Sequence, residues 1–246
     1  MGIDAMQRRR YCLRAATNRR FDGVNGRPPS PGVAVDAAAS RKARCTTMSR
    51  IDLKTAPNVW QTPRLQLESP RPEHAAAFAA GVAASMPGLA YVAWGLRPRD
   101  VDWARRFCED DARSVAAGED LVFHVFERAD GGWVGRIDVH MIDFDASRGE
   151  IGYVGDVRRA GRGLMREAAL AVIDLCFQLG FERIEAMSDA RNTRALHFAE
   201  TLGMLYEGVL RQHERDPQGQ LCDMALYAVL AGSPALAFRE ATDGTR

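Results

Sequence analysis

Residues 149–168 read GEIGYVGDVRRAGRGLMREA, a strand-like apolar run followed by two closely spaced glycines and a helix-like segment. Gly161 and Gly163 are separated by one residue, and glycine reaches left-handed backbone conformations that other residues avoid. A helix that begins directly after such a turn directs its first N–H groups and the positive end of its dipole at the turn. The spacing therefore predicts a site for an anionic group, held mainly by backbone amides.

The segments on either side of this loop alternate between strand and helix periods. Strands are predicted at residues 64–69, 121–128, 133–143, 149–154, 183–189, 204–215 and 221–230. Helices are predicted at residues 73–85, 101–117, 164–179 and 193–202, the third ending at Gly180. The strands from 121 to 154 have hairpin-length connections and should be antiparallel. The sequence thus predicts one α/β domain from about residue 60 to 231, with a mixed, mostly antiparallel sheet of about seven strands and about four helices.

The first 48 residues differ in composition from the rest of the chain. They hold ten Lys plus Arg against three Asp plus Glu, a net charge of +7, which leaves about −6 on the remainder because the whole chain carries +1. The segment has no strand or helix period and few residues able to form a core, so we predict a disordered basic leader. A targeting or nucleic-acid-binding role stays open, as does translation that begins in truth at Met48. Residues 232–246 are predicted to be a tail.

Cysteine usage and hydropathy indicate the compartment. The cysteines are scattered and never form a C-x-x-C pair; they are Cys12, Cys45, Cys108, Cys176 and Cys222. This pattern favours a reducing compartment and predicts no metal site. No apolar stretch approaches the roughly 18 to 20 residues of a membrane span, so we predict a cytoplasmic location and no membrane partner. Nucleic acid is not expected as a partner of the domain, and a homodimer stays open.

Two well-known phosphate-binding loops do not fit residues 159–168. A Walker loop requires G-x-x-x-x-G-K-[ST], and the chain has no such run. A Rossmann loop requires a third glycine where this chain has Arg166, and it expects repeated β-α-β units in place of three antiparallel strands before the loop. Both are therefore disfavoured.

Residues 150–168, EIGYVGDVRRAGRGLMREA, resemble the acetyl-CoA motif of the GNAT N-acetyltransferases. The similarity is to the branch with the RimJ/RimL-type ribosomal-protein N-terminal acetyltransferases, which read approximately E-I-G-Y-x-x-x-P-x-x-R-G-x-G-x-x-x-E-A. Residues 189–204, DARNTRALHFAETLGM, resemble their D-x-x-N-x-x-S-x-x-x-x-E-x-x-G-F, and TPRLQLES at 62–69 resembles their opening T-x-R-L-x-L-R. The resemblance covers about 170 residues and implies a GNAT fold.

The resemblance also implies acetyl-CoA as cosubstrate and assigns residues to it. The loop amides would hold the pyrophosphate, two arginines would add positive charge, two strand residues would bond the pantetheine arm through their main chain, and an asparagine would contact the same arm. These residues are Tyr153, Val154, Arg159, Ala160, Gly161, Arg162, Gly163, Leu164 and Asn192. In the alternative interpretation the glycines only form a tight turn and Asn192 caps the short helix.

Three positions depart from the family pattern. Ala160 stands where the family usually has a basic residue, but amides hold most of the anion, so we expect binding to survive. Ala195 stands where this branch carries a serine proposed to protonate the leaving thiolate, and Ala199 where other branches carry a tyrosine for that role. The general acid is therefore unassigned, and an acyl-CoA-binding module without turnover remains an alternative.

The attacking amine must be neutral, so the site needs a base. Glu150 lies on the strand before the loop, where the resemblance places the glutamate base of some GNAT enzymes. Arg136, Asp138 and His140 share one face of the preceding strand, and His140 has a suitable ordinary pKa. Glu150 and His140 are the catalytic candidates. In the structural alternative, Glu150 pairs with Arg136 or Arg148 and His140 is a hydrogen-bonded sheet residue. His124 and His197 are interpreted as structural.

The implied activity is acetyl transfer from acetyl-CoA to a primary amine. The acidic domain would attract a cationic acceptor. We expect a protein or peptide α-amine, with a small-molecule amine such as a polyamine, an aminoglycoside or an amino acid as the alternative. In this branch the segment at residues 85–100, SMPGLAYVAWGLRPRD, helps to form the acceptor cleft, but its residues do not identify a ligand.

Overall fold

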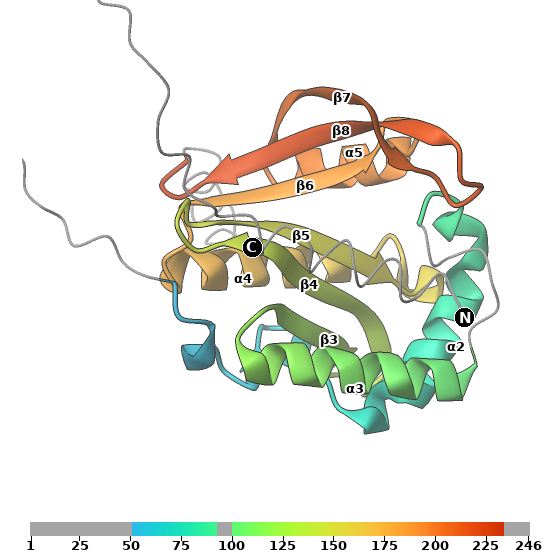
Figure 1. Ribbon diagram of the computed structural model, residues 1–246. Helices are drawn as coiled ribbons and strands as arrows, with labels where there is room; N and C mark the ends of the chain where they lie inside the picture. The colour runs from blue at the N-terminus through green and yellow to red at the C-terminus, as the bar shows by residue number, and fades with distance from the viewer. Residues whose placement is uncertain (1–50, 93–99, 234–246) are drawn as a thin grey trace, which may run out of the picture. The chain divides into compact units, whose positions relative to one another are not determined.

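The computed structural model describes residues 51–92 and 100–233 of the chain (Figure 1). The predicted leader at residues 1–48 lies outside the described residues, as do residues 93–99 and the tail from residue 234. The strands are β1 (Val59–Gln61), β2 (Leu65–Glu68), β3 (Leu121–Glu127), β4 (Trp133–Asp143), β5 (Arg148–Gly155), β6 (Arg183–Asp189), β7 (Leu205–Arg215) and β8 (Leu221–Leu230). The helices are α2 (Ala75–Ser85), α3 (Val101–Ala117), α4 (Leu164–Gln178) and α5 (Thr193–Thr201), with short 3-10 segments η1 (Leu53–Thr55), η2 (Pro72–His74), η3 (Met86–Leu89) and η4 (Val157–Arg159).

The described strands form one 8-stranded sheet in the order β1-β2-β3-β4-β5-β6-β8-β7. The predicted α/β architecture is confirmed, including the mixed, mostly antiparallel sheet and, in the described part of the chain, four α-helices. The sheet has one strand more than the seven that the periodicity indicated. The additional strand, β1, is 3 residues long, and so short a run cannot display an alternating pattern.

The sheet changes character between β5 and β6. These strands run parallel and pair only from Arg148–Glu150 to Arg183–Glu185. Beyond Glu150, β5 keeps β4 as its neighbour, and beyond Glu185, β6 keeps β8. Among the described strands, the edge of β5 that faces β6 therefore has no partner from Ile151 to Gly155, and the sheet opens there.

Helices cover both faces of the sheet. Figure 1 shows α3 and α4 on opposite sides of it. The larger core lies on the α4 and α5 side, where Leu164 and Val172 meet Ile137. The smaller core lies under α2 and α3, where Phe78 meets Trp133.

The ends of the helices follow from local sequence. Asp100 caps α3 by accepting a hydrogen bond from the Trp103 amide at 2.7 Å, which satisfies one of the unpaired donors of the first turn. After α4, the Gly180 backbone has φ +98°, and the Phe181 amide donates to the Cys176 carbonyl at 3.0 Å. Gly180 therefore ends α4 in a left-handed conformation, at the residue where the sequence predicted the end of this helix.

The close approach of α2 to the sheet depends on Gly81. A Cβ atom there would lie 2.2 Å from the Trp133 ring. Alanine is the better helix former by roughly 1 kcal/mol, but overpacking of a core costs about 1–3 kcal/mol. We expect Gly81→Ala to lower the free energy of unfolding, measured by urea denaturation. The loss should shrink in a Trp133→Phe background, which removes the ring atoms in question, and an equal loss in both backgrounds would contradict this packing.

Candidate active site

The glycine loop joins β5 to α4 through η4. Gly161 has φ +77° and Gly163 has φ +71°, values at which any other residue is strained. A Cβ atom on Gly161 would meet no other atom within 4 Å, so backbone conformation and not crowding calls for glycine there. Leu164 begins α4 with a side chain that is 2 % exposed and anchors the helix on the core.

The loop presents amides to solvent at the start of α4. Gly163 is the N-cap of α4 and has no side chain with which to cap it. The first-turn N–H groups of a helix have no acceptor within the helix, so this end of α4 is suited to an anion. The Ala160 amide, in contrast, donates to the Val157 carbonyl at 3.1 Å. The amides suited to an external anion therefore begin after Ala160, one residue later than the resemblance implies.

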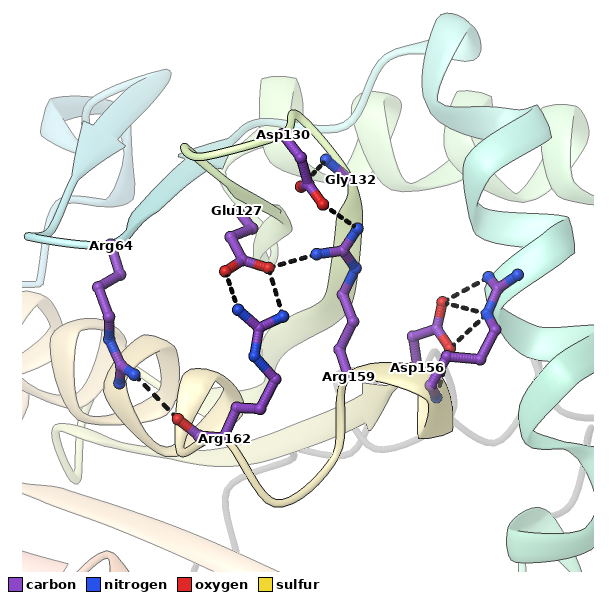
Figure 2. A network of polar contacts seen from close by, with 8 residues as sticks. Arg64, Glu127, Asp130, Gly132, Asp156, Arg159 and Arg162 are labelled. Atoms are coloured by element: carbon purple, nitrogen blue, oxygen red, sulfur yellow. Dashed lines mark hydrogen bonds and ion pairs between the residues drawn. The ribbon is translucent and has the colours of Figure 1, made fainter.

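Two arginines of the loop are tied to the end of β3 (Figure 2). Glu127, which is 5 % exposed, accepts hydrogen bonds from Arg159 and Arg162, the Arg162 Nη1 to Glu127 Oε2 distance being 2.8 Å. The other end of the Arg159 guanidinium donates to Asp130 Oδ2 at 2.8 Å. A side chain on Gly132 would collide with that guanidinium. Both arginines thus have carboxylate partners within the protein, which the sequence did not indicate.

A second contact connects the loop to the beginning of the domain. Arg64 Nη1 donates to the Arg162 carbonyl at 2.9 Å (Figure 2). The Arg64 Nε and the Thr62 hydroxyl both donate to the Glu167 carboxylate of α4. The TPRLQLES segment therefore meets the glycine loop in space, which is a physical reason for the two motifs to occur together.

Glu127 should contribute to stability through these contacts. In Glu127→Gln the two guanidinium groups lose their shared charge partner, although one hydrogen bond can persist. Because Glu127 is buried while the two guanidinium groups stay partly exposed to water, we expect the free energy of unfolding in urea to fall by about 1 kcal/mol, the net contribution of a typical hydrogen bond. Glu73→Gln changes the same charge at an exposed residue and should leave stability nearly unchanged. Equal stability of the two variants would contradict a structural role for Glu127.

The predicted pantetheine-binding residues lie around the opening between β5 and β6. The Val154 side chain is buried among the residues under α2 and α3. The Tyr153 ring faces the other way and packs on Phe198, with 4.6 Å between ring centroids. Asn192 Oδ1 accepts a hydrogen bond from the Ala195 amide at 3.3 Å. Asn192 thus caps α5, as the alternative interpretation held, and the cap uses only its side-chain oxygen.

A row of side chains with alternating charge lies on the face of the sheet that α3 covers. Arg136 donates to Asp111 of α3 at 2.7 and 2.9 Å and also bonds to Asp138. Asp138 Oδ2 lies 2.7 Å from His140 Nδ1, and His140 Nε2 lies 3.8 Å from Glu150 Oε1. The polar face predicted for β4 is therefore present. It extends from α3 to Glu150, where the pairing of β5 with β6 ends.

Burial and neighbouring charges set the protonation of this chain. Burial raises the pKa of Glu150, the carboxylates of Glu214 and Asp138 raise it further, and His140 opposes them, with a resulting value of about 7. Burial alone would lower the pKa of His140, but Asp138 and the charge of Glu150 outweigh it and raise the pKa to about 9. At pH 7 His140 is therefore an imidazolium and Glu150 is partly ionised. His140 does not keep the ordinary pKa that suggested it as a base.

The structural alternatives for these residues have different outcomes. Arg136 is engaged by Asp111 and Asp138, and Arg148 lies 3.0 Å from Glu185 and 3.7 Å from Asp143. Neither arginine is thus positioned as the partner of Glu150.

The contacts of the two histidines interpreted as structural do not involve Glu150. His124 is fully buried and accepts a hydrogen bond from the Trp133 indole at 3.1 Å, and His197 pairs with Glu200 on α5.

Some sequence predictions concern features that the described residues show only in part. Cys108, Cys176 and Cys222 are buried free thiols. Within residues 51–92 and 100–233, no group of three or more His, Cys, Asp or Glu side chains could hold a metal ion. In the same part of the chain, no helix has the length and apolar character needed to cross a bilayer. Most of the second half of the expected acceptor segment, residues 93–99, lies outside the described residues.

Comparison with known proteins identifies the family of this domain. The acetyltransferase (GNAT) domain family matches residues 64–205. The uncharacterised N-acetyltransferase p20 of Bacillus licheniformis is 34% identical over 98 residues, 39% of this chain and 54% of that protein. The probable N-acetyltransferase YjcK of Bacillus subtilis (strain 168) is 30% identical over 125 residues, 50% of this chain and 65% of that protein. The matched part thus spans between half and two thirds of the length of these curated relatives.

Solved structures share the fold at low sequence identity. The microcin C7 self-immunity acetyltransferase MccE, in complex with acetyl-CoA and AMP, has a TM-score of 0.66 at 18% identity, covering 73% of this chain and 99% of that one. The ribosomal L7/L12 α-N-protein acetyltransferase RimL, in complex with coenzyme A, has a TM-score of 0.64 at 18% identity, covering 70% and 97%. At these identities the similarity is one of fold.

Proposed function

This chain belongs to the acetyltransferase (GNAT) domain family, and we propose that it transfers an acetyl group from acetyl-CoA to a primary amine. The observation that carries the proposal is the glycine loop before α4, placed at one end of the opening between β5 and β6. Glu150, with its raised pKa, lies at the other end of the same opening. An extended carrier with an anionic group at one end and a reactive acyl group at the other fits this arrangement.

At the anionic end, the amides from Gly161 to Leu164 would bind the pyrophosphate together with the dipole of α4. We expect Arg159 and Arg162 to hold the loop through Glu127 and to contribute positive charge nearby. Tyr153 and Val154 would bond the pantetheine arm through their main chain along the open edge of β5, as an added strand does. The side-chain NH2 of Asn192 would contact the same arm, because the helix cap occupies only Oδ1.

At the reactive end, the carboxylate of Glu150 would accept a proton from the amine as its nitrogen attacks the thioester carbon. A general base works best with a pKa near the operating pH, and Glu150 has a pKa of about 7. The His140 imidazolium, with a pKa of about 9, would stabilise the Glu150 carboxylate. His140 would thus assist Glu150 and would not itself act as the base at neutral pH.

The acceptor that fits this base is an α-amine. Deprotonation at pH 7 costs about 1 to 1.4 kcal/mol for an α-amine and about 4.6 kcal/mol for a lysine side chain, because the ordinary pKa of the lysine amine is higher. Asp138, Glu185 and Glu214 are close enough to raise the pKa of Glu150, and their charge favours a cationic acceptor. We therefore propose a protein or peptide N-terminus, and the similar fold of RimL, named for α-N-protein acetylation, is consistent with it.

Two other functions remain as alternatives. A small-molecule amine such as a polyamine, an aminoglycoside or an amino acid would meet the same carboxylates. A module that binds acyl-CoA without turnover is favoured by Ala195 and Ala199, since the resemblance implies hydroxyl side chains at these two positions in other members of the family.

Release of CoA thiol from acetyl-CoA tests the proposal. The acceptor panel contains a peptide whose only amine is its N-terminus, an N-acetylated peptide with one lysine, spermidine and an aminoglycoside. We expect release only with the free N-terminus, together with CoA binding by calorimetry. Release with the lysine peptide or spermidine alone would overturn the proposal of an N-terminal acceptor. CoA binding without release above the hydrolysis background would establish the alternative of a module that binds acyl-CoA without turnover. Absence of CoA binding would contradict the function of the loop.

A further inference from the structure

The side chain of Tyr153 extends from β5 to α5, beside the opening between β5 and β6. Its hydroxyl donates a hydrogen bond to the Ala195 carbonyl at 3.3 Å, and its ring packs on Phe198 of α5. Tyr153 lies on the part of β5 that no longer pairs with β6. A phenol group is therefore held at the opening from the α5 side.

Tyr153 and Glu150 approach the opening from opposite faces of the sheet. Glu150 lies beside His140 on the α3 side, whereas Tyr153 packs among residues of the larger core on the α4 and α5 side. Side chains three positions apart on a strand point to opposite faces. An acyl group placed between the strands would thus have a base on one side and a hydroxyl donor on the other, so an amine can attack from the first side while the leaving group departs toward the second.

We propose that the Tyr153 hydroxyl donates a hydrogen bond to the sulfur atom that leaves when acetyl-CoA reacts. The inference rests on the proposed function, because it places the acetyl-bearing end of the cosubstrate in this opening. It assigns a catalytic side chain to the step for which Ala195 and Ala199 offer no hydroxyl. Rotation about the C–O bond can redirect the phenol proton away from the Ala195 carbonyl, its acceptor in this structure.

The bonds and protons balance without proton transfer from Tyr153. The amine nitrogen bonds to the carbonyl carbon, the C–S bond breaks, and its electron pair remains on sulfur as a thiolate. The amine proton passes to Glu150 and then to water. Alkyl thiols have pKa values near 8.5, so the thiolate needs stabilisation at neutral pH and takes its proton from water after release. Burial raises the pKa of Tyr153, which keeps the phenol protonated as a donor throughout.

Tyr153→Phe tests the inference because phenylalanine keeps the ring packing on Phe198. A hydrogen bond to a charged group is worth enough to change a rate about tenfold or more. We expect kcat to fall about tenfold while the Kd for CoA changes less than twofold. The thiol pKa of bound CoA, followed by thiolate absorbance across pH, should lie below that of free CoA in the wild type and rise by about 1 unit in the variant.

Tyr227→Phe is the matched control. Tyr227 is buried, and its hydroxyl donates to Glu200 of α5 at 3.2 Å, so this variant also loses one phenol hydrogen bond to α5, but from β8, a strand that β6 separates from β5. Its kcat and bound-thiol pKa should match the wild type.

Ser188 of β6 is the alternative hydroxyl donor to the sulfur. It shares a strand face with Ile184 and Ala186, which belong to the core on the α4 and α5 side, and Ser188→Ala tests it.

The outcomes separate this inference from the proposed function. A wild type that turns over while Tyr153→Phe keeps its kcat and its bound-thiol pKa would overturn the inference alone. A raised thiol pKa in Ser188→Ala only would transfer the role to Ser188. A bound CoA whose thiol pKa equals that of free CoA in the wild type would overturn the inference without any variant. A wild type that binds no CoA would overturn the proposed function itself.

Discussion

Gly161→Glu is expected to raise the Kd for CoA at least a hundredfold, measured by calorimetry. A left-handed backbone costs a non-glycine residue roughly 1–2 kcal/mol, and Gly161 has φ +77°. The open space around its Cβ position lets the new carboxylate occupy the volume in front of the amides. Two like charges about 4 Å apart repel by about 4 kcal/mol at the dielectric of a protein surface. Repulsion from the pyrophosphate therefore exceeds the strain.

Two variants separate strain from charge at this position. Gly161→Ala introduces the strain alone and should weaken binding by no more than about fivefold, since 1 kcal/mol corresponds to roughly that factor and strain at this φ acts on the free protein as well as on the complex. Gly219 has φ +83° and similarly open surroundings in the turn between β7 and β8, so Gly219→Glu adds the same charge and strain away from the loop. It should leave the Kd within twofold. An unchanged Kd in Gly161→Glu would mean that the loop does not hold the pyrophosphate.

The periodicity of the sequence predicted most elements of the fold and the polar face of β4, but not the face that every residue of that strand occupies. In β4, simple alternation would place Trp133 on the same face as Ile137. A register shift between Val125 and Phe126 of β3 interrupts the pairing with β4, and Trp133 joins the core under α2 while Ile137 joins the other core. Trp133 and Val134 are adjacent apolar residues and break the alternation, but this break does not say which of them faces which core, so the pairing of the two strands is needed to assign the faces.

The sequence also located the backbone parts of the site better than the side-chain contacts. Gly161 and Gly163 are recognisable because a backbone requirement is local. Glu127, however, is 32 residues from Arg159, and no local pattern connects them. The sequence could have predicted the direction of the His140 pKa shift, because Asp138 is two positions away on the same strand face. The size of the shift depends on the burial of that contact, which the sequence does not give.

The pH dependence of turnover should identify the base. Glu150→Gln is expected to lower kcat/KM about a hundredfold at pH 8, since general bases typically contribute factors of 10² to 10⁴. In the wild type the carboxylate is the active form, so kcat/KM should rise with pH through the Glu150 pKa of about 7 and then level off as the amine acceptor loses its own proton near pH 8. The variant should retain only the limb that belongs to the acceptor.

Glu185→Gln is the control for charge, and the position of the limb discriminates between the two candidate bases. Glu185 lies opposite Glu150 on β6, and its charge raises the pKa of Glu150, so its removal should move the acidic limb to lower pH while the plateau stays within about threefold. If His140 were the base, the limb would lie near its pKa of about 9 and would survive in Glu150→Gln. A limb near pH 7 that disappears with Glu150 and shifts downward with Glu185 is consistent only with proton transfer to Glu150.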